Sequence, residues 1–270
     1  MAITTADGFF GAAKQRDKIA KTASFTTVAA TPFSTLDVAG IPAAGSLAVG
    51  NTANGLVPTD AVAGFPVINA FGGGATGYLA SAQFRNSVVG GAVLYDRLFH
   101  VGSISLLALA TTTLSSQPSY TGRLPGGTDY SNLEILLEIN AAMSATATTV
   151  SVSYTNEAGV TGRSTGASIS LSGFTTRRVL SLPLQAGDKG VQRIDSVTVG
   201  GTVATTGTFN VVVARNLANF DIRVANALDS QAWDMLGGPV VFADSALWLV
   251  VQPDSTAAGV PALSYQIING

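Results

Sequence analysis

The pattern that most constrains the fold is the alternation within "TTVSVSYTNEAGVTGRSTGASISLSG", residues 148–173. Val150, Val152 and Tyr154 alternate with Ser and Thr, which is typical of a β-strand with one buried face. The "NEAG" that follows suits a hairpin turn, because Gly159 can adopt the positive φ that such turns require. With a partner strand after the turn, the segment predicts a β-hairpin.

Short segments of the same kind recur after residue 77, separated by turn residues. Residues 78–99 indicate two strands that break at Gly90-Gly91. Residues 133–143, "LEILLEINAAM", fit either a helix or a buried strand, and the alternation of Ile135, Leu137 and Ile139 with their neighbours favours the strand. The other expected strands are residues 177–187, 190–201, 207–217, 246–252 and 263–269.

Two helices are expected among these strands. Residues 7–21 predict one near the start of the chain, with Asp7 as its N-cap and Lys18 and Lys21 near its C-terminal end. This segment is rich in charge, and it fits either a surface helix or an arm that docks on a neighbour. Residues 224–236, "VANALDSQAWDML", predict a second short helix.

The rest of the N-terminal third favours loops. Residues 24–40 predict short extended segments broken at Pro32, and residues 39–66 predict a long Gly, Ala and Pro-rich loop with short strand fragments. Long loops in compact proteins are commonly functional or part of an interface. We therefore expect an N-terminal helix and loop-rich arm over 1–77, followed by a β body over 78–270 that leaves room for two subdomains.

Many short strands with regular turns predict an all-β, mainly antiparallel protein of the sandwich or jelly-roll type. Composition adds a statement about the surface. Only 11% of the residues are charged, against about a quarter in an average soluble protein, and the formal net charge is −2. A surface this poor in charge favours association, so we expect a homo-oligomer, with a trimer as the leading possibility.

A nucleotide motif is present in "NAFGGGATGYL", residues 69–79. Gly72-x-Gly74-x-x-Gly77 has the dinucleotide-binding spacing, and Asp96 lies where a ribose-binding carboxylate is expected. That function needs a helix after the last glycine, whereas a strand-like segment follows. A phosphate loop would need Lys at Tyr78. We interpret the glycines as a turn and expect no bound cofactor.

The titratable residues form no catalytic or metal-binding pattern. His100 is the only histidine, no nucleophile motif accompanies it, and we expect a structural residue with its hydrogen bonds satisfied. Glu134 with Glu138, or Asp188 with Asp195, could pair for glycoside hydrolysis, but a solvated edge is the simpler interpretation. The sequence predicts no catalytic residue, no metal ligand set and no enzyme.

Other charged groups predict ion pairs between strands or subunits. They are the "YDR" at 95–97, Arg177-Arg178, and Arg193 with Asp195. No basic cluster indicates nucleic-acid binding, and aromatic residues, at 7%, do not gather into a sugar-binding platform.

The sequence predicts neither a membrane-spanning segment nor a signal peptide. The uncharged run 98–122 is too rich in Ser, Thr and Gly for a membrane span, and "MAITTADGFF" lacks the features of a signal peptide. The absence of cysteine excludes disulfides and thiolate metal sites.

Three stretches resemble the virion structural proteins of tailed bacteriophages: "SYTNEAGVTGR" (153–163), "LPLQAGDKGVQRIDSV" (182–197) and "VFADSALWLVV" (241–251). Among these proteins, a β-rich chain of this size is most similar to capsid decoration, or cement, proteins, which are commonly trimers seated on the head shell. The long spine helix of a major capsid protein is not evident in the sequence.

The resemblance implies a non-enzymatic virion component that is assembled in the bacterial cytoplasm. Its partners would be identical copies and the major capsid protein or other virion proteins, without nucleic acid or membrane. A tail, collar or fibre protein remains an alternative. A carbohydrate-binding or glycan-cleaving β-sandwich module is the alternative of a different class, and it expects Glu134 or Glu138 to line a cleft beside aromatic rings.

Overall fold

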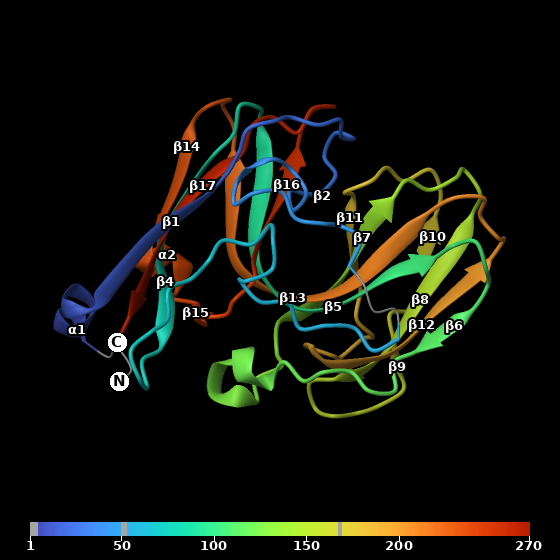
Figure 1. Ribbon diagram of the computed structural model, residues 1–270, viewed down its shortest axis with the longest axis horizontal. Helices are drawn as coiled ribbons and strands as arrows, with labels where there is room; N and C mark the ends of the chain where they lie inside the picture. The colour runs from blue at the N-terminus through green and yellow to red at the C-terminus, as the bar shows by residue number, and fades with distance from the viewer. Residues whose placement is uncertain (1–4, 50–52, 167–168) are drawn as a thin grey trace. The chain divides into compact units, whose positions relative to one another are not determined.

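The computed structural model describes residues 5–49, 53–166 and 169–270. It is an all-β protein with three antiparallel sheets, two short α-helices and two 3-10 turns, Thr121–Arg123 and Pro125–Gly127. The predicted fold class is therefore confirmed (Figure 1). Across the described ranges, none of the helices is long and apolar enough to cross a membrane.

The chain divides into two compact units. Unit 1 comprises Met1–Ser46, Thr59–Asp96 and Asn216–Gly270, and unit 2 comprises Leu47–Pro58 and Arg97–Arg215. Two long strands, β5 (Gly90–Ser105) and β13 (Thr208–Ile222), begin in one unit and end in the other. These boundaries differ from the expected division after residue 77, since residues on both sides of it belong to unit 1.

Unit 1 is a two-sheet sandwich. One sheet has the strand order β14-β4-β17-β1-β3, and the second consists of β16 and β2 with the unit 1 parts of β5 and β13. The core between them includes Phe33, Phe84, Leu249 and Ile267. The other strands of this unit are β1 Ala13–Lys21, β2 Phe33–Ser34, β3 Gly40–Ile41, β4 Gly77–Arg85, β14 Leu228–Ala232, β15 Val240–Val241, β16 Leu247–Pro253 and β17 Ala262–Asn269.

Unit 2 is also a two-sheet sandwich. One sheet has the order β10-β8-β12-β6, with β9 paired to β8, and the other consists of β11, β7 and the unit 2 parts of β13 and β5. Its core includes Phe99, Ile135, Tyr154 and Phe209. The remaining strands are β6 Thr111–Thr113, β7 Leu133–Ala141, β8 Thr148–Asn156, β9 Arg163–Ser164, β10 Ile169–Leu171, β11 Val179–Leu182 and β12 Val191–Gly201.

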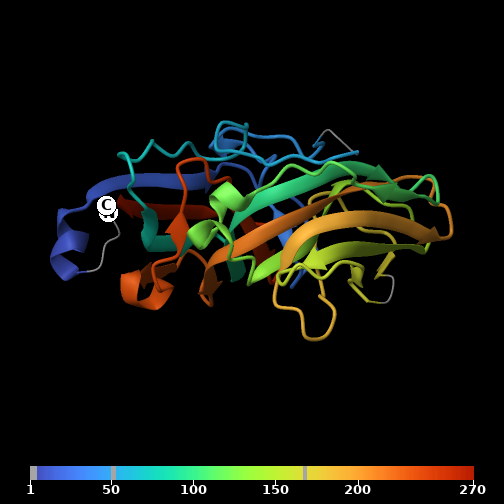
Figure 2. The same cartoon turned by 90° about the horizontal axis from the view of Figure 1, so that it is seen from below.

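The helix predicted over 7–21 is wrong beyond its first turn. Helix α1 covers only Ala6–Gly11, and its N-cap is Thr5, whose hydroxyl accepts a hydrogen bond from the Gly8 amide, rather than Asp7. The rest of the segment is strand β1, which pairs along its length with the C-terminal strand β17 (Figure 2). Helix propensity is a weak preference, and pairing with a distant strand outweighs it.

The second predicted helix is also mostly strand. In 224–236, residues Leu228–Ala232 form β14, an edge strand on β4, and only Trp233–Leu236 form helix α2. Exposure alternates along β14, as expected for a strand whose two faces differ. The segment's Ala and Leu residues favour a helix locally, but they do not report this pairing.

The remaining strand predictions are confirmed. Residues 133–143 contain β7, and 148–173 contain β8 with its partners β9 and β10. Gly159 has φ of 80°, as the predicted hairpin turn requires. Residues 78–99 give β4 and the start of β5, but the break lies at residues 86–89 rather than at Gly90-Gly91, which begin β5, and the two strands belong to different sheets.

Candidate functional site

The loops at the two ends of the unit 2 sandwich differ sharply in chemistry. We call residues 117–132, 156–163 and 184–195 the charged end, and residues 105–114, 141–148, 169–173 and 200–208 the uncharged end. Strand β8 runs from the uncharged end at Thr148 to the charged end at Asn156, and β12 returns beside it. Both ends therefore belong to one sandwich.

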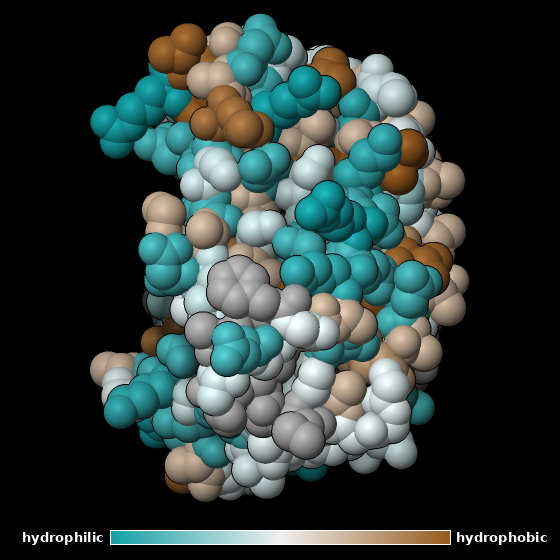
Figure 3. Space-filling view, turned by 90° about the vertical axis from the view of Figure 1, so that its left-hand side faces the viewer, coloured by the Kyte–Doolittle hydropathy of each residue, from teal (hydrophilic) through white to brown (hydrophobic). Residues whose placement is uncertain are grey.

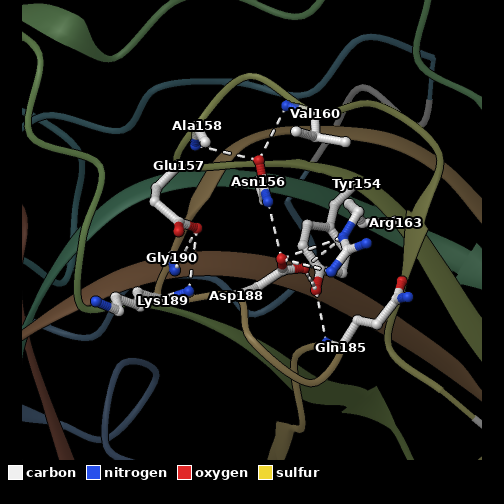
Figure 4. A network of polar contacts seen from close by, with 10 residues as sticks. All are labelled: Tyr154, Asn156, Glu157, Ala158, Val160, Arg163, Gln185, Asp188, Lys189 and Gly190. Atoms are coloured by element: carbon white, nitrogen blue, oxygen red, sulfur yellow. Dashed lines mark hydrogen bonds and ion pairs between the residues drawn. The ribbon is translucent and has the colours of Figure 1, made fainter.

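Asp188 is the centre of the charged end (Figure 4). Its carboxylate accepts hydrogen bonds from the Tyr154 hydroxyl at 2.7 Å and the Asn156 amide at 2.8 Å. The Arg163 guanidinium donates to it from Nε at 2.8 Å and forms an ion pair at 2.7 Å. Arg163 and the other donors hold the pKa of Asp188 well below its usual range. Asp188 is therefore an ionised structural anchor near neutral pH.

The same network fixes the backbone of both loops. The Asn156 side-chain oxygen accepts from the amides of Ala158 and Val160 across the hairpin turn. Glu157 Oε2 accepts from the amides of Lys189 and Gly190, at 3.0 and 3.1 Å. These bonds join the loop after β8 to the loop before β12, so the stretches 153–163 and 182–197 lie side by side (Figure 4).

Burial and the bond to Asp188 also raise the pKa of Tyr154 to about 12. The Tyr154 hydroxyl accepts a hydrogen bond from the Gln185 amide at 2.7 Å while it donates to Asp188. Both of these contacts lie inside the loops. Tyr154 therefore has a structural role in holding the loop before Asp188.

A second carboxylate at this end is satisfied in the same way. Asp195 accepts from the Thr155 hydroxyl at 3.0 Å and forms an ion pair with Arg193 at 2.7 Å. The expected Arg193–Asp195 ion pair is present, but it joins two residues of the same strand, β12, rather than two strands or subunits. Asp188 and Asp195 do not share a site, since each is bound to its own set of donors.

The uncharged end is held mainly by backbone hydrogen bonds. Leu106 donates to the Gly207 carbonyl and accepts from the Ala204 amide, each at 3.1 Å. Ser144, in the segment 141–148, bonds to two other segments. Its amide donates to the Thr206 carbonyl, and its carbonyl accepts from the Gly173 amide. Four segments that are distant in sequence thus converge at one end of the sandwich.

The segments of the uncharged end contain only Ala, Gly, Ile, Leu, Met, Ser, Thr and Val. Three large apolar side chains are solvent-exposed there, with exposed fractions of 53% for Leu107, 48% for Leu109 and 46% for Val203. The surrounding hydroxyls form local bonds, such as Thr111 with Thr198 at 3.0 Å. The adjoining residues 174–178, which bond to Ile139 and Met143, carry the partly exposed Arg177 and Arg178. Apart from these two arginines, this surface can be buried against another protein without removing a charge from water.

The glycine motif is a turn. The Ala75 amide donates to the Gly72 carbonyl, Gly74 has φ of 75°, and strand β4 rather than a helix begins at Gly77. A Cβ on Gly77 would lie 2.4 Å from the Phe71 ring, so this position needs glycine for close packing. Asp96 is fully buried and accepts from the Ser245 hydroxyl at 2.9 Å.

His100 is buried within β5, where its backbone pairs with Leu56. Burial, and then the charge of Arg97, lower its pKa to about 2, so the ring is neutral near pH 7. Its Nδ1 has no hydrogen-bond partner among the described residues, which corrects the expectation of a fully satisfied histidine. No cluster of three or more His, Asp or Glu suited to a metal occurs in the described part of the chain.

The solvated edge expected for Glu138 is wrong. Its side chain is fully buried and forms an ion pair with Arg97 at 2.9 Å, and it accepts from Asn210 at 3.0 Å. Glu134 lies on the same strand and is only partly exposed. Arg178 lies 3.9 Å from the centre of the Phe174 ring, a cation–π contact that the expected ion pairs did not include.

The sequence analysis missed two of these features. For the Arg97–Glu138 pair, the segment 95–97 was expected to form an ion pair between strands, which Arg97 does, but its partner Glu138 lies on a strand distant in sequence and no local pattern reports it. The uncharged end does leave a signal, because each of its segments is a run without charged residues. The convergence of these runs follows only from the strand pairing.

Comparison with known proteins identifies no family. No protein-family model matches the chain, and no curated protein matches its sequence. Among solved structures, the infectious bursal disease virus VP2 subviral particle aligns over 96% of this chain and 80% of that chain, with 9% identity and a TM-score of 0.19. The structure of the Gx strain of that virus covers 95% and 80%, with 10% identity and a TM-score of 0.16. TM-scores this low do not establish a shared fold.

Proposed function

We propose that this chain is a non-enzymatic structural component of a tailed-phage virion, and specifically a capsid decoration protein that acts as a homo-oligomer, most simply a trimer. The observation that carries the proposal is the uncharged end of unit 2. The three sequence stretches that resemble virion proteins support it.

The uncharged end suits contact between identical copies. In a symmetric contact the same patch, or neighbouring parts of it, comes from every copy, so a patch with net charge brings like charges together. A patch of Leu, Val, Ala and Thr avoids this repulsion. Burying it contributes about 25 cal/mol per Å² of apolar surface, from which the cost of association is subtracted.

The titratable groups already described also fit a structural protein. Asp188 and Asp195 are bound by donors from their own loops, Glu138 is paired inside the core, and His100 is neutral and buried. The three carboxylates are thus bound within the fold, and the buried His100 is uncharged near pH 7.

The oligomer is tested by light scattering coupled to gel filtration at low micromolar concentration. We expect a mass that is a multiple of the 27.3 kDa chain mass, three times that value for a trimer. A single species of 27.3 kDa would contradict the proposed oligomer.

The location is tested by electron microscopy of the source particle, labelled with an antibody against this chain. We expect labels over the head shell. Labels over the tail or collar would overturn the decoration role but keep the virion role. Particles without label would overturn both.

A further inference from the structure

A row of basic side chains lies on the outer face of unit 1. Strand β1 alternates, so Ile19 and Lys21 are buried while Lys14, Arg16 and Lys18 are exposed on the opposite face. We call these three exposed residues the basic stripe. Figure 3 shows hydrophilic side chains gathered across this side of the molecule.

The strands beside the stripe present neutral polar groups. Arg16 pairs in register with Gln266 of β17, which pairs with Ser81 of β4. One step along, Lys18 pairs with Ser264, which pairs with Gln83. These six residues, together with Asp17 and Tyr265, line an open cavity of about 590 Å³ on the sheet.

Three of the cations on this face form no ion pair among the described residues. Across the described ranges, no carboxylate forms an ion pair with Arg16, Lys18 or Arg85, which is exposed at the end of β4. Asp17, the nearest acid in sequence, has its register partner in the buried Tyr265, and its Oδ1 accepts from the Lys18 amide. Like charges at alternate positions of one strand repel each other, and an anionic partner would relieve this repulsion.

We propose that the basic stripe binds an extended acidic segment of a different protein chain. Alternate residues of a strand lie about 7 Å apart. In an extended segment with Asp or Glu at every second position, each carboxylate can therefore face one cation of the stripe. The cavity beside the stripe adds Ser and Gln groups that can hydrogen-bond to such a segment.

The partner cannot be a segment of a second copy. Among the 16 Asp and Glu residues of this chain, none is within three positions of another in sequence, and Glu134 and Glu138 are the nearest two. An acidic peptide is also favoured over a long nucleic acid, because the chain's net charge of −2 repels a polyanion beyond the stripe.

The test is fluorescence anisotropy with a short labelled peptide in which Glu and Thr alternate. Its control is a peptide of the same composition with the Glu residues in one block. An oligothymidylate of equal charge is the third probe. The proteins are the intact chain, Arg16→Gln/Lys18→Gln, and the matched control Lys189→Gln/Arg223→Gln, which removes two exposed cations elsewhere. Circular dichroism confirms that each variant is folded.

We expect the alternating peptide to bind the intact chain and the control variant equally. The stripe variant should bind about tenfold more weakly or worse, and salt should weaken binding of the intact chain. Equal binding of both peptides would overturn the spacing match. Equal binding by all three proteins, or no binding by any, would overturn the site. Tighter binding of the oligothymidylate, lost in the stripe variant, would replace the acidic peptide with nucleic acid.

Discussion

The two ends of the unit 2 sandwich use the same strands but hold their loops in different ways. At the charged end, side chains hold the loops, and Asp188 alone accepts from Tyr154, Asn156 and Arg163. At the uncharged end, backbone groups do most of this, and Leu107 and Val203 remain exposed.

This difference is the basis for the proposed contact between copies. The charged groups of the charged end are largely used within their own loops, so burying that end against a partner would disturb bonds that already exist. The uncharged end contains no such network. The charged end is thus the more self-contained one, and the uncharged end is the one proposed as the contact surface.

Breaking the buried Arg97–Glu138 ion pair should have the largest effect on stability. Glu138→Gln leaves the Arg97 guanidinium without its counterion in the interior, and the free energy of unfolding should fall by about 3–5 kcal/mol. Urea unfolding measures it. The double variant Arg97→Met/Glu138→Leu should recover most of the loss, because neither charge remains buried. A single variant as stable as the native chain would show that the pair is not needed.

Asp188→Asn tests the charged end directly. An amide cannot accept from all the donors that surround Asp188, so we expect a loss of about 2 kcal/mol at pH 7. The lowered pKa of Asp188 determines how its contribution to stability changes with pH. Its contribution is complete above the unfolded carboxyl pKa, near 4, and is lost as the pH falls toward the lower folded pKa.

Between pH 7 and pH 3, the free energy of unfolding measured with urea should therefore fall less for Asp188→Asn than for the native chain. The matched variant Asp195→Asn removes a more exposed carboxylate, with a 20% exposed side chain against 2% for Asp188, and should cost less. An equal fall in the free energy of unfolding of the native chain and of Asp188→Asn would contradict the central role of Asp188 in stabilising this end.

Gly159→Ala should have the smallest effect. Gly159 has φ of 80°, and an added Cβ would make only an ordinary contact, 3.5 Å from Gln192. The cost is conformational, about 1 kcal/mol, measured by urea unfolding. Gly122→Ala is the control, because no atom lies within 4 Å of its added Cβ and its φ is not positive. The same small change for both would mean that the hairpin does not depend on this turn.

Much of the β structure could be predicted from the sequence, because its signals are local. The alternation at 148–173 and the glycine at the turn identify the hairpin without knowledge of any other residue. The segments 7–21 and 224–236 were misjudged for the opposite reason. Their strands exist because β17 and β4 pair with them, and those partners are far along the chain.

The candidate surfaces were only partly visible in the sequence. The Asp188 network joins two of the stretches that resemble virion proteins, but its contacts depend on how β8 and β12 pair. The alternate cations of the basic stripe were hidden by the helix predicted over 7–21, because a helix would place Lys14 and Lys18 on one face and Arg16 on another. The spacing of apolar and charged residues over 7–21 did not by itself distinguish a helix from a strand.

The most direct test of the central claim compares one charge introduced at each end. Val203 at the uncharged end and Val160 at the charged end are similarly exposed, at 46% and 50%. We expect Val203→Asp to reduce the light-scattering mass to the 27.3 kDa of one chain, because identical charges would meet in the contact. Val160→Asp should keep the native mass. Native mass for Val203→Asp, or equal dissociation of both variants, would contradict the uncharged end as the contact between copies.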